Sequence, residues 1–259
     1  MSGRVTRLYG IPLSHPVLGV RSMLAFKGIA VRYVELLAGG HPPMLWALGF
    51  RGATVPAIRL PDGRRVQGSL AIAQALEQFA PSPSLYPAQP AARAAVADAE
   101  RWGEAVLQPT PRRVIRWGLR HHLAQRQWFA DVASPLPAPR VTGILMTPIV
   151  PVFARIAGAN DSQVRQDLDR LPDLLNEVDR LIEQGVIGGD RLNAADFQIA
   201  PSIRMLLAMT DIAGLVADRP AATLARRVVA DYPVIPAALP ADWVPTSMRR
   251  PSGSKTNIS

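Results

Sequence analysis

Ser14 is the side chain of this sequence that is best placed to take part in a reaction. It follows the apolar stretch 5–10 and precedes a stretch with helical periodicity, so it falls in the loop before a helix. A hydroxyl at the positive end of a helix can donate a hydrogen bond to a thiolate and lower the pKa of a thiol from about 8.5. Ser14 itself would not attack but would hold the sulfur of a bound thiol ionised. The alternative is that Ser14 only caps the helix.

A second group of candidate residues lies in the segment 54–69. The Pro-Asp-Gly signature at 61–63 separates two short apolar stretches, which predicts a β-hairpin. Pro56 cannot donate to a central ladder, so we expect it to open the first strand. A cis bond before Pro56 would expose backbone groups of Val55 to a ligand, and an ordinary strand start is the alternative.

The hairpin ends in Gly68 and Ser69, directly before the helical pattern of residues 70–77. We expect the hydroxyl of Ser69 to cap this helix, whose free N–H groups attract a carboxylate or a phosphate. A plain cap without any ligand is the alternative.

Regular elements must bring these groups together. The pattern predicts, before the hairpin and its helix, strands at 5–10 and 31–37 and helices within 17–29 and 44–48. This order is typical of a thioredoxin-like α/β unit.

The chain beyond the proline-rich stretch 81–87 has almost wholly helical patterns. They cover 91–107, 114–127, 164–183 and 197–209, with prolines 109 and 111 expected to interrupt the first pair. Asn193 and Asp196 are spaced for a capping box, and the proline-rich loop 132–140 has the length of an insertion or lid.

These patterns predict a fold of two classes, α/β followed by all-α. We expect a thioredoxin-like domain at 1–80, a stiff linker at 81–90, an all-helical domain at 91–245 and a disordered tail at 246–259.

Composition excludes several kinds of chemistry. The 259 residues include no cysteine, which rules out disulfides, thiolate metal sites and a cysteine nucleophile. His121 and His122 are adjacent and would point about 100° apart on a helix, so we expect no metal. The net charge of +9 is spread along the chain and over a basic tail, so no nucleic-acid partner is expected. Prolines and Arg155 interrupt the apolar run 141–156, and no leader is recognisable, so we expect no membrane partner and a cytoplasmic location.

Several further residues have two possible roles. His15 could add positive charge near a thiol or simply be solvated, whereas Tyr9 is expected to be a core or subunit-facing aromatic residue. An apolar pocket in the helical half could be formed by large side chains that could equally belong to the core, namely Trp102, Trp117, Trp128, Met146 and Phe153.

Together these motifs resemble those of the glutathione transferases. The resemblance includes Val55-Pro56 and Ser69, and it extends over most of the chain, through 8–16, Val20-Arg21, 85–87, Arg93, Trp102 and 193–196. Members of the serine type carry an active serine in the loop where Ser14 lies, although His15 follows it here instead of proline. Gly68 stands where the family usually has Glu or Gln.

The resemblance implies a role for each candidate residue. Val55 and the cis Pro56 would pair with the backbone of glutathione, and positions 68 and 69 would hold its γ-glutamyl end. Thr54, Arg51 and His41 lie in loops that approach its glycyl end. Asn193 and Asp196 would serve folding.

The function implied is the addition of glutathione, as co-substrate, to a hydrophobic electrophile, or a thiol-assisted isomerisation. A homodimer is expected because the family is usually dimeric. Two alternatives remain open: a non-catalytic binding or structural protein with the same fold, and an enzyme that uses a different low-molecular-weight thiol.

Overall fold

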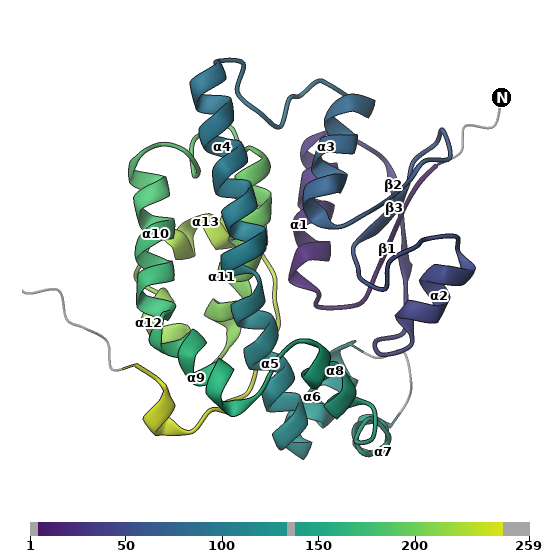
Figure 1. Cartoon of the computed structure of the whole chain (residues 1–259), viewed down its shortest axis with the longest axis vertical. Helices are drawn as coiled ribbons and strands as arrows, with labels where there is room; N and C mark the ends of the chain where they lie inside the picture. The colour runs from purple at the N-terminus through teal and green to yellow at the C-terminus, as the bar shows by residue number, and fades with distance from the viewer. Residues whose placement is uncertain (1–4, 134–137, 246–259) are drawn as a thin grey trace, which may run out of the picture.

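The structure is a computed structural model that describes residues 5–133 and 138–245. Its N-terminal half is a small mixed sheet with helices on both sides (Figure 1). The elements are β1 (Thr6–Gly10), α1 (His15–Phe26), β2 (Val31–Glu35), α2 (His41–Ala47), β3 (Ala57–Arg59), β4 (Arg65–Gln67) and α3 (Ser69–Phe79). The expected thioredoxin-like order is confirmed.

The sheet has the strand order β2-β1-β3-β4, with β1 and β2 parallel and the remaining pairs antiparallel. Alternate residues of each strand face opposite layers. Leu8 and Ile58 belong to the core that includes α1 and α3, whereas Tyr9 and Ala57 pack with Leu45 of α2. Tyr9 is therefore a core residue, and its ring meets that of Phe50 edge to face.

The hairpin between β3 and β4 forms as predicted. Gly63 takes a φ of 93°, a conformation that glycine adopts without steric cost. Asp62 accepts a hydrogen bond of 2.9 Å from the backbone N–H of Arg64 and so stabilises the turn.

The C-terminal half is helical, as expected. It contains α4 (Pro90–Trp102), a π-helical turn (Gly103–Leu107), α5 (Pro109–His121), α6 (Leu123–Ala133), α7 (Pro139–Leu145), α8 (Val150–Ile156), α9 (Asp161–Asp169), α10 (Leu171–Glu183), α11 (Ala194–Ala208), α12 (Ala213–Val216) and α13 (Pro220–Val228).

Two details of this half differ from the sequence-based expectation. The interruption expected at the prolines takes the form of a π-helical turn that follows the first helix, and Pro109 begins α5, where its missing N–H costs no hydrogen bond. The pattern 164–183 is divided between α9 and α10, which meet at Arg170 just before Pro172.

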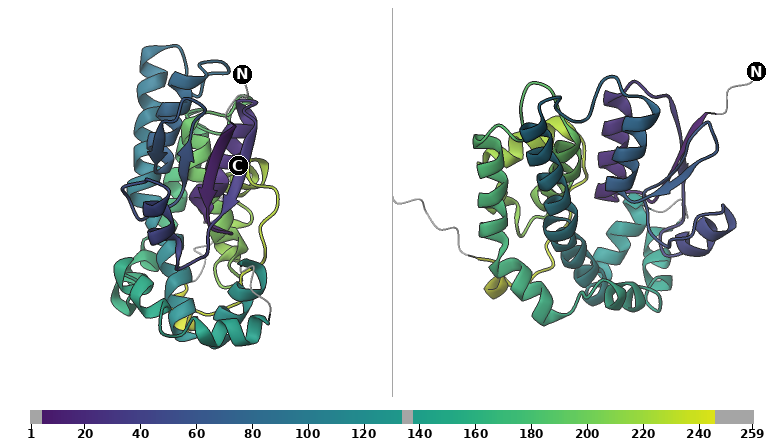
Figure 2. Two further views of the ribbon diagram at one scale, coloured as in Figure 1. Left: turned by 90° about the vertical axis from the view of Figure 1, so that its right-hand side faces the viewer. Right: turned by 45° about the horizontal axis from the view of Figure 1, so that its top comes forward.

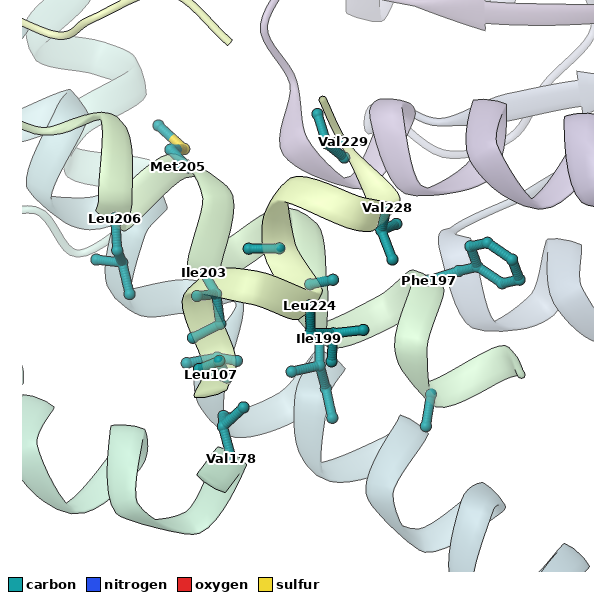
Figure 3. Close-up of a cluster of buried hydrophobic side chains, with 14 of the residues drawn as sticks. Leu107, Val178, Phe197, Ile199, Ile203, Met205, Leu206, Leu224, Val228 and Val229 are labelled. Carbon is teal, nitrogen blue, oxygen red and sulfur yellow. The ribbon is translucent and has the colours of Figure 1, made fainter. Parts of the chain in front are cut away.

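The central helix of this half is α11, which is buried along almost its whole length. Figure 3 shows apolar side chains of α11 among those of neighbouring helices, including Leu107, Val178 and Leu224. The predicted capping box is present: Asn193 accepts from the N–H of Asp196, and the Asp196 carboxylate accepts from the N–H of Asn193 at 2.8 Å. These bonds satisfy N–H groups that burial would otherwise leave without partners.

Helix α1 connects the two halves because it packs against the sheet on one side and against α11 on the other (Figure 2). Its closest approach is at Gly19, where a Cβ would collide with the carbonyl oxygen of Phe197 and lie 3.0 Å from Pro201 Cγ. The absence of a side chain at Gly19 therefore sets the distance between the two helices.

The stretch that connects the halves is anchored by side chains of the N-terminal half. The ammonium group of buried Lys27 donates to Glu77 at 3.0 Å and to the carbonyl of Pro83 at 2.8 Å. Glu77 also accepts from the N–H of Leu85 at 2.9 Å.

The proposed tail 246–259 and part of the loop 132–140 lie outside the described residues. Among the helices that the structure describes, none combines the length and the apolar character needed to cross a bilayer.

We predict that Gly19→Ala lowers the free energy of unfolding by about 2 kcal/mol or more, because the added methyl group forces α1 away from α11. Urea denaturation measures this effect. The matched control is Gly214→Ala in α12, where nothing lies within 4 Å of the new Cβ. Equal stability of the two variants would contradict the proposed contact.

Candidate functional site

A cavity of about 160 Å³ lies at the start of α1, and both halves of the chain contribute to its wall. From the N-terminal half come the β1–α1 loop with Ser14, His41 of α2, and the pair Thr54 and Val55. Helices α5 and α6, Met205 of α11 and the segment around Tyr232 form the remainder. The cavity thus joins the loop that carries Ser14 to the residues before Pro56.

Ser14 occupies the N-cap position of α1, but its hydroxyl makes no capping hydrogen bond. No hydrogen-bond partner for this hydroxyl occurs within residues 5–133 and 138–245. The hydroxyl lines the cavity beside the positive end of a helix and is free to donate to a ligand.

The loop that carries Ser14 has an unusual backbone. Leu13 has a φ of 60°, which is uncommon for a residue with a side chain. The hydroxyl of Tyr232 donates to the carbonyl of Leu13 at 2.8 Å and holds this loop against the C-terminal segment. Sequence analysis had not identified Tyr232, which lies more than two hundred positions from Leu13 in the chain.

Val55 lines the cavity and has backbone groups that are free within the described residues. Neither its N–H nor its C=O has a hydrogen-bond partner among the residues that the structure describes, and the Val55–Pro56 bond is cis. The preceding loop is fixed by Gln67, whose amide accepts from the N–H of Gly52 at 2.7 Å and donates to the carbonyl of Thr54 at 3.1 Å. Gln67 is a second positioning residue that the sequence did not single out.

The structure brings Pro56, Gly68 and Ser69 together but does not place them in the cavity wall that Ser14 lines. The N–H of Gly68 donates to the carbonyl of Pro56 at 3.0 Å. Gly68 has a φ of 88° and occupies the N-cap position of α3, so the predicted cap by Ser69 is wrong: Ser69 is the first helical residue, and no side chain caps this helix. Since Gly68 has no side chain, it can offer a ligand only its backbone.

His15 is buried, contrary to both roles considered for it. Burial, together with the positive charge of Arg112, lowers its pKa from 6.5 to about 3, so the ring is neutral at physiological pH. His41 is buried as well, and burial lowers its pKa. Each ring leaves one nitrogen without a partner among the described residues.

The positive charge of the cavity comes instead from Arg112 and Arg116, one turn apart on α5. Burial and the neighbouring Arg112 lower the pKa of Arg116 to about 10, which still leaves its guanidinium charged. This pair was also missed by sequence analysis, although the spacing i, i+4 in an otherwise apolar helix face was visible.

Of the aromatic and sulfur-containing residues considered for an apolar pocket, Trp128 lines the cavity, together with Phe129, Ile115 and Met205. Trp117 belongs to the core and donates from its indole to Asp161 at 2.8 Å. The described part of the chain holds no cluster of three or more His, Asp or Glu side chains suited to a metal ion.

The glutathione S-transferase N-terminal domain is the family whose model matches this chain, over residues 8–84. This range spans β1 to α3 and contains Ser14, the Val55–Pro56 bond and Ser69. Residues 8–84 are therefore similar to the N-terminal domain of the glutathione S-transferases.

Solved structures of glutathione transferases share the fold over nearly the whole chain. A glutathione S-transferase from Rhodospirillum rubrum F11 is 22% identical, with a TM-score of 0.58, and the match covers 92% of this chain and 99% of that one. Glutathione transferase F7 from Populus trichocarpa is 18% identical, with a TM-score of 0.59, and the match covers 89% of this chain and 96% of that one. The beta-etherase LigF from Sphingobium sp. strain SYK-6 is 17% identical, with a TM-score of 0.58, and the match covers 90% of this chain and 97% of that one. No curated protein matches the sequence.

We predict that the burial of His15 in this transferase-like fold appears in the pH dependence of stability. In the unfolded chain His15 is protonated below about pH 6.5, whereas in the native protein it stays neutral until about pH 3. The free energy of unfolding therefore falls as the pH drops from 6.5 to 3. The loss is about 1.4 kcal/mol per pH unit at its steepest. His15→Asn removes this component of the slope.

Denaturant unfolding at several pH values measures the difference between wild type and variant. The control is His122→Asn, because His122 is exposed. A slope that is the same in wild type and His15→Asn would show that the pKa of His15 is not lowered in the native state.

Proposed function

We propose that this protein is a glutathione transferase-like enzyme in which Ser14 activates a small thiol, with glutathione as the co-substrate. The observation that carries this proposal is the free hydroxyl of Ser14 at the start of α1, in the same cavity as the unpaired backbone of Val55. An extended peptide can pair with such a backbone in the manner of an added strand. Its sulfur would then lie near Ser14.

The reaction is attack of the thiolate on an electrophilic carbon or a thiol-assisted isomerisation. In the first case the sulfur forms a bond to carbon, the leaving group departs with the bonding electrons, and the thiol proton goes to solvent. The hydroxyl of Ser14 and the dipole of α1 stabilise the negative sulfur. Thr54 and His41 lie where they can contact the peptide end of the thiol.

We propose that residues 1–80 bind the thiol, that 81–90 link the halves and that 91–245 supply the wall for a hydrophobic electrophile. Pro56, Gly68 and Ser69 belong to the thiol site through the backbone and the free N–H groups at the start of α3. A cytoplasmic homodimer without metal, nucleic-acid or membrane partners completes this proposal.

The second candidate function is a binding or structural protein that keeps the fold without the chemistry. Gly68 favours it, because a position without a side chain offers the γ-glutamyl end less than a Glu or Gln would. His15 favours it as well, because its neutral ring does not assist the ionisation of a thiol.

We predict that Ser14→Ala lowers kcat/KM for glutathione and chlorodinitrobenzene about 100-fold, because one donor to the sulfur is lost. The pKa of the bound thiol should rise by about one unit, while glutathione affinity changes only a few-fold. Absorbance of the thiolate against pH and steady-state rates measure both. Ser162→Ala, at an exposed position of α9, is the matched control. Unchanged turnover in Ser14→Ala would remove Ser14 from the mechanism.

We predict that glutathione binds this protein with measurable heat and raises its midpoint of thermal unfolding, since a ligand that binds only the native state stabilises it. A panel of other low-molecular-weight thiols under the same conditions tests the choice of thiol. Absence of heat up to millimolar glutathione, with no response to the panel, would favour the non-catalytic alternative.

A further inference from the structure

Helix α5 carries three arginines within five residues, and their surroundings differ. Arg113 forms a paired contact with Asp167 of α9, with Nη2 to Oδ1 at 2.7 Å, and so is neutralised within the protein. Arg112 and Arg116 face the cavity instead. Arg113 therefore serves as an internal comparison: its charge is balanced by an acidic side chain of the protein.

Arg112 and Arg116 lack such a partner. Neither forms an ion pair within the described residues, and Glu104 is the acidic group close enough to Arg112 to raise its pKa. Arg116 makes one weak hydrogen bond of 3.3 Å to the carbonyl of Phe153. Burial lowers the pKa of both guanidinium groups; the charge of Arg113 adds to this effect at Arg112, and the charge of Arg112 adds to it at Arg116. Both buried charges therefore cost the free protein stability.

The groups around the two arginines do not relieve this positive charge. His15 and His41 in the same wall are buried and have lowered pKa values, and each has a ring nitrogen without a partner in the described part of the chain. Two guanidinium groups and two imidazole rings thus line the cavity, and no Asp or Glu is among its lining residues in the described part of the chain. An organic anion could accept hydrogen bonds from both guanidinium groups and neutralise their charge.

The position of the arginines identifies which ligand carries the anion. Arg112 and Arg116 alternate along α5 with apolar Ile115 and Leu119, and Trp128 of α6 adds an aromatic surface. These residues belong to the helical half, whereas Val55 and Thr54 belong to the half that we assign to the thiol. The wall is therefore apolar with a cationic end.

We propose that the second substrate of this cavity is an apolar electrophile that carries a carboxylate or sulfonate, and that Arg112 and Arg116 bind this group. The proposal rests on the proposed function and narrows its substrate class from hydrophobic to amphiphilic and anionic. A guanidinium binds such a group through two parallel hydrogen bonds, which fixes the orientation of the electrophile toward the sulfur.

The test uses chlorodinitrobenzoate and its methyl ester, which differ in charge but share the reactive carbon. Calorimetry without thiol measures binding alone, since no nucleophile is present. We expect wild type to bind the acid about 10- to 100-fold more tightly than the ester. Arg112→Met and Arg116→Met should bring this ratio close to one, and Arg116→Lys should leave an intermediate ratio.

The matched control is Arg120→Met, which removes an exposed arginine from the same helix and should keep the wild-type ratio. The midpoint of thermal unfolding should not fall in Arg116→Met, because one of two repelling charges is removed. Equal affinity of wild type for acid and ester would overturn the proposal. The proposal would also be overturned if Arg116→Met lost affinity for glutathione but still preferred the acid over the ester. That result would assign Arg112 and Arg116 to the thiol.

Rates with glutathione separate this proposal from the proposed function. In the reaction the sulfur bonds to the ring carbon and chloride leaves with its electron pair. Turnover of the ester and of chlorodinitrobenzene without any acid preference would keep the enzyme and refute the anion site. Wild type could instead prefer the acid, with this preference lost in both arginine variants, yet turn over none of the electrophiles. That result would support the anion site and refute the proposed enzymatic activity.

Discussion

The contact between α1 and α11 at Gly19 is the constraint on which the site depends. Ser14 lies at the start of α1, and the cavity beside it needs a second wall from the helical half. A side chain at Gly19 would separate the helices and open that wall. The buried capping box of α11 and the hydrogen bond from Tyr232 to Leu13 act on the same geometry, because they fix the partner helix and the loop.

The local elements of this fold could be predicted from the sequence because each carries its own signal. The Pro-Asp-Gly turn, the periodicity of residues 70–77 and the Asn193–Asp196 box all depend on neighbours within a few residues. The prediction that Ser69 caps α3 was wrong, because it relied only on the presence of a hydroxyl near the expected start of the helix. The positive φ of Gly68 shifts the helix start by one residue, and no propensity rule detects that shift.

The composition of the cavity could be predicted only in part, because its wall is built from segments far apart in the chain. Ser14 and Val55 were found through resemblance to known motifs. Arg112, Arg116 and Tyr232 were not. The two arginines are distinguished by having no acidic partner among the described residues, and Tyr232 by a partner far away in the chain. Trp117 shows the converse: the sequence allows it as a pocket residue, but in the structure it is buried among the side chains of the core.

The charge of the cavity depends on which of its side chains gain or lose a proton near neutral pH. Burial keeps His15 neutral down to about pH 3, while Arg116, with a pKa of about 10, stays charged throughout the physiological range. The field of the cavity is therefore constant where cellular pH varies. A thiol bound there meets a fixed positive potential from guanidinium groups and a helix end, and a fixed potential lowers a thiol pKa without titrating itself. In the proposed function, ionisation in this pH range therefore belongs to the thiol, and the protein provides a permanent charge that favours the ionised form.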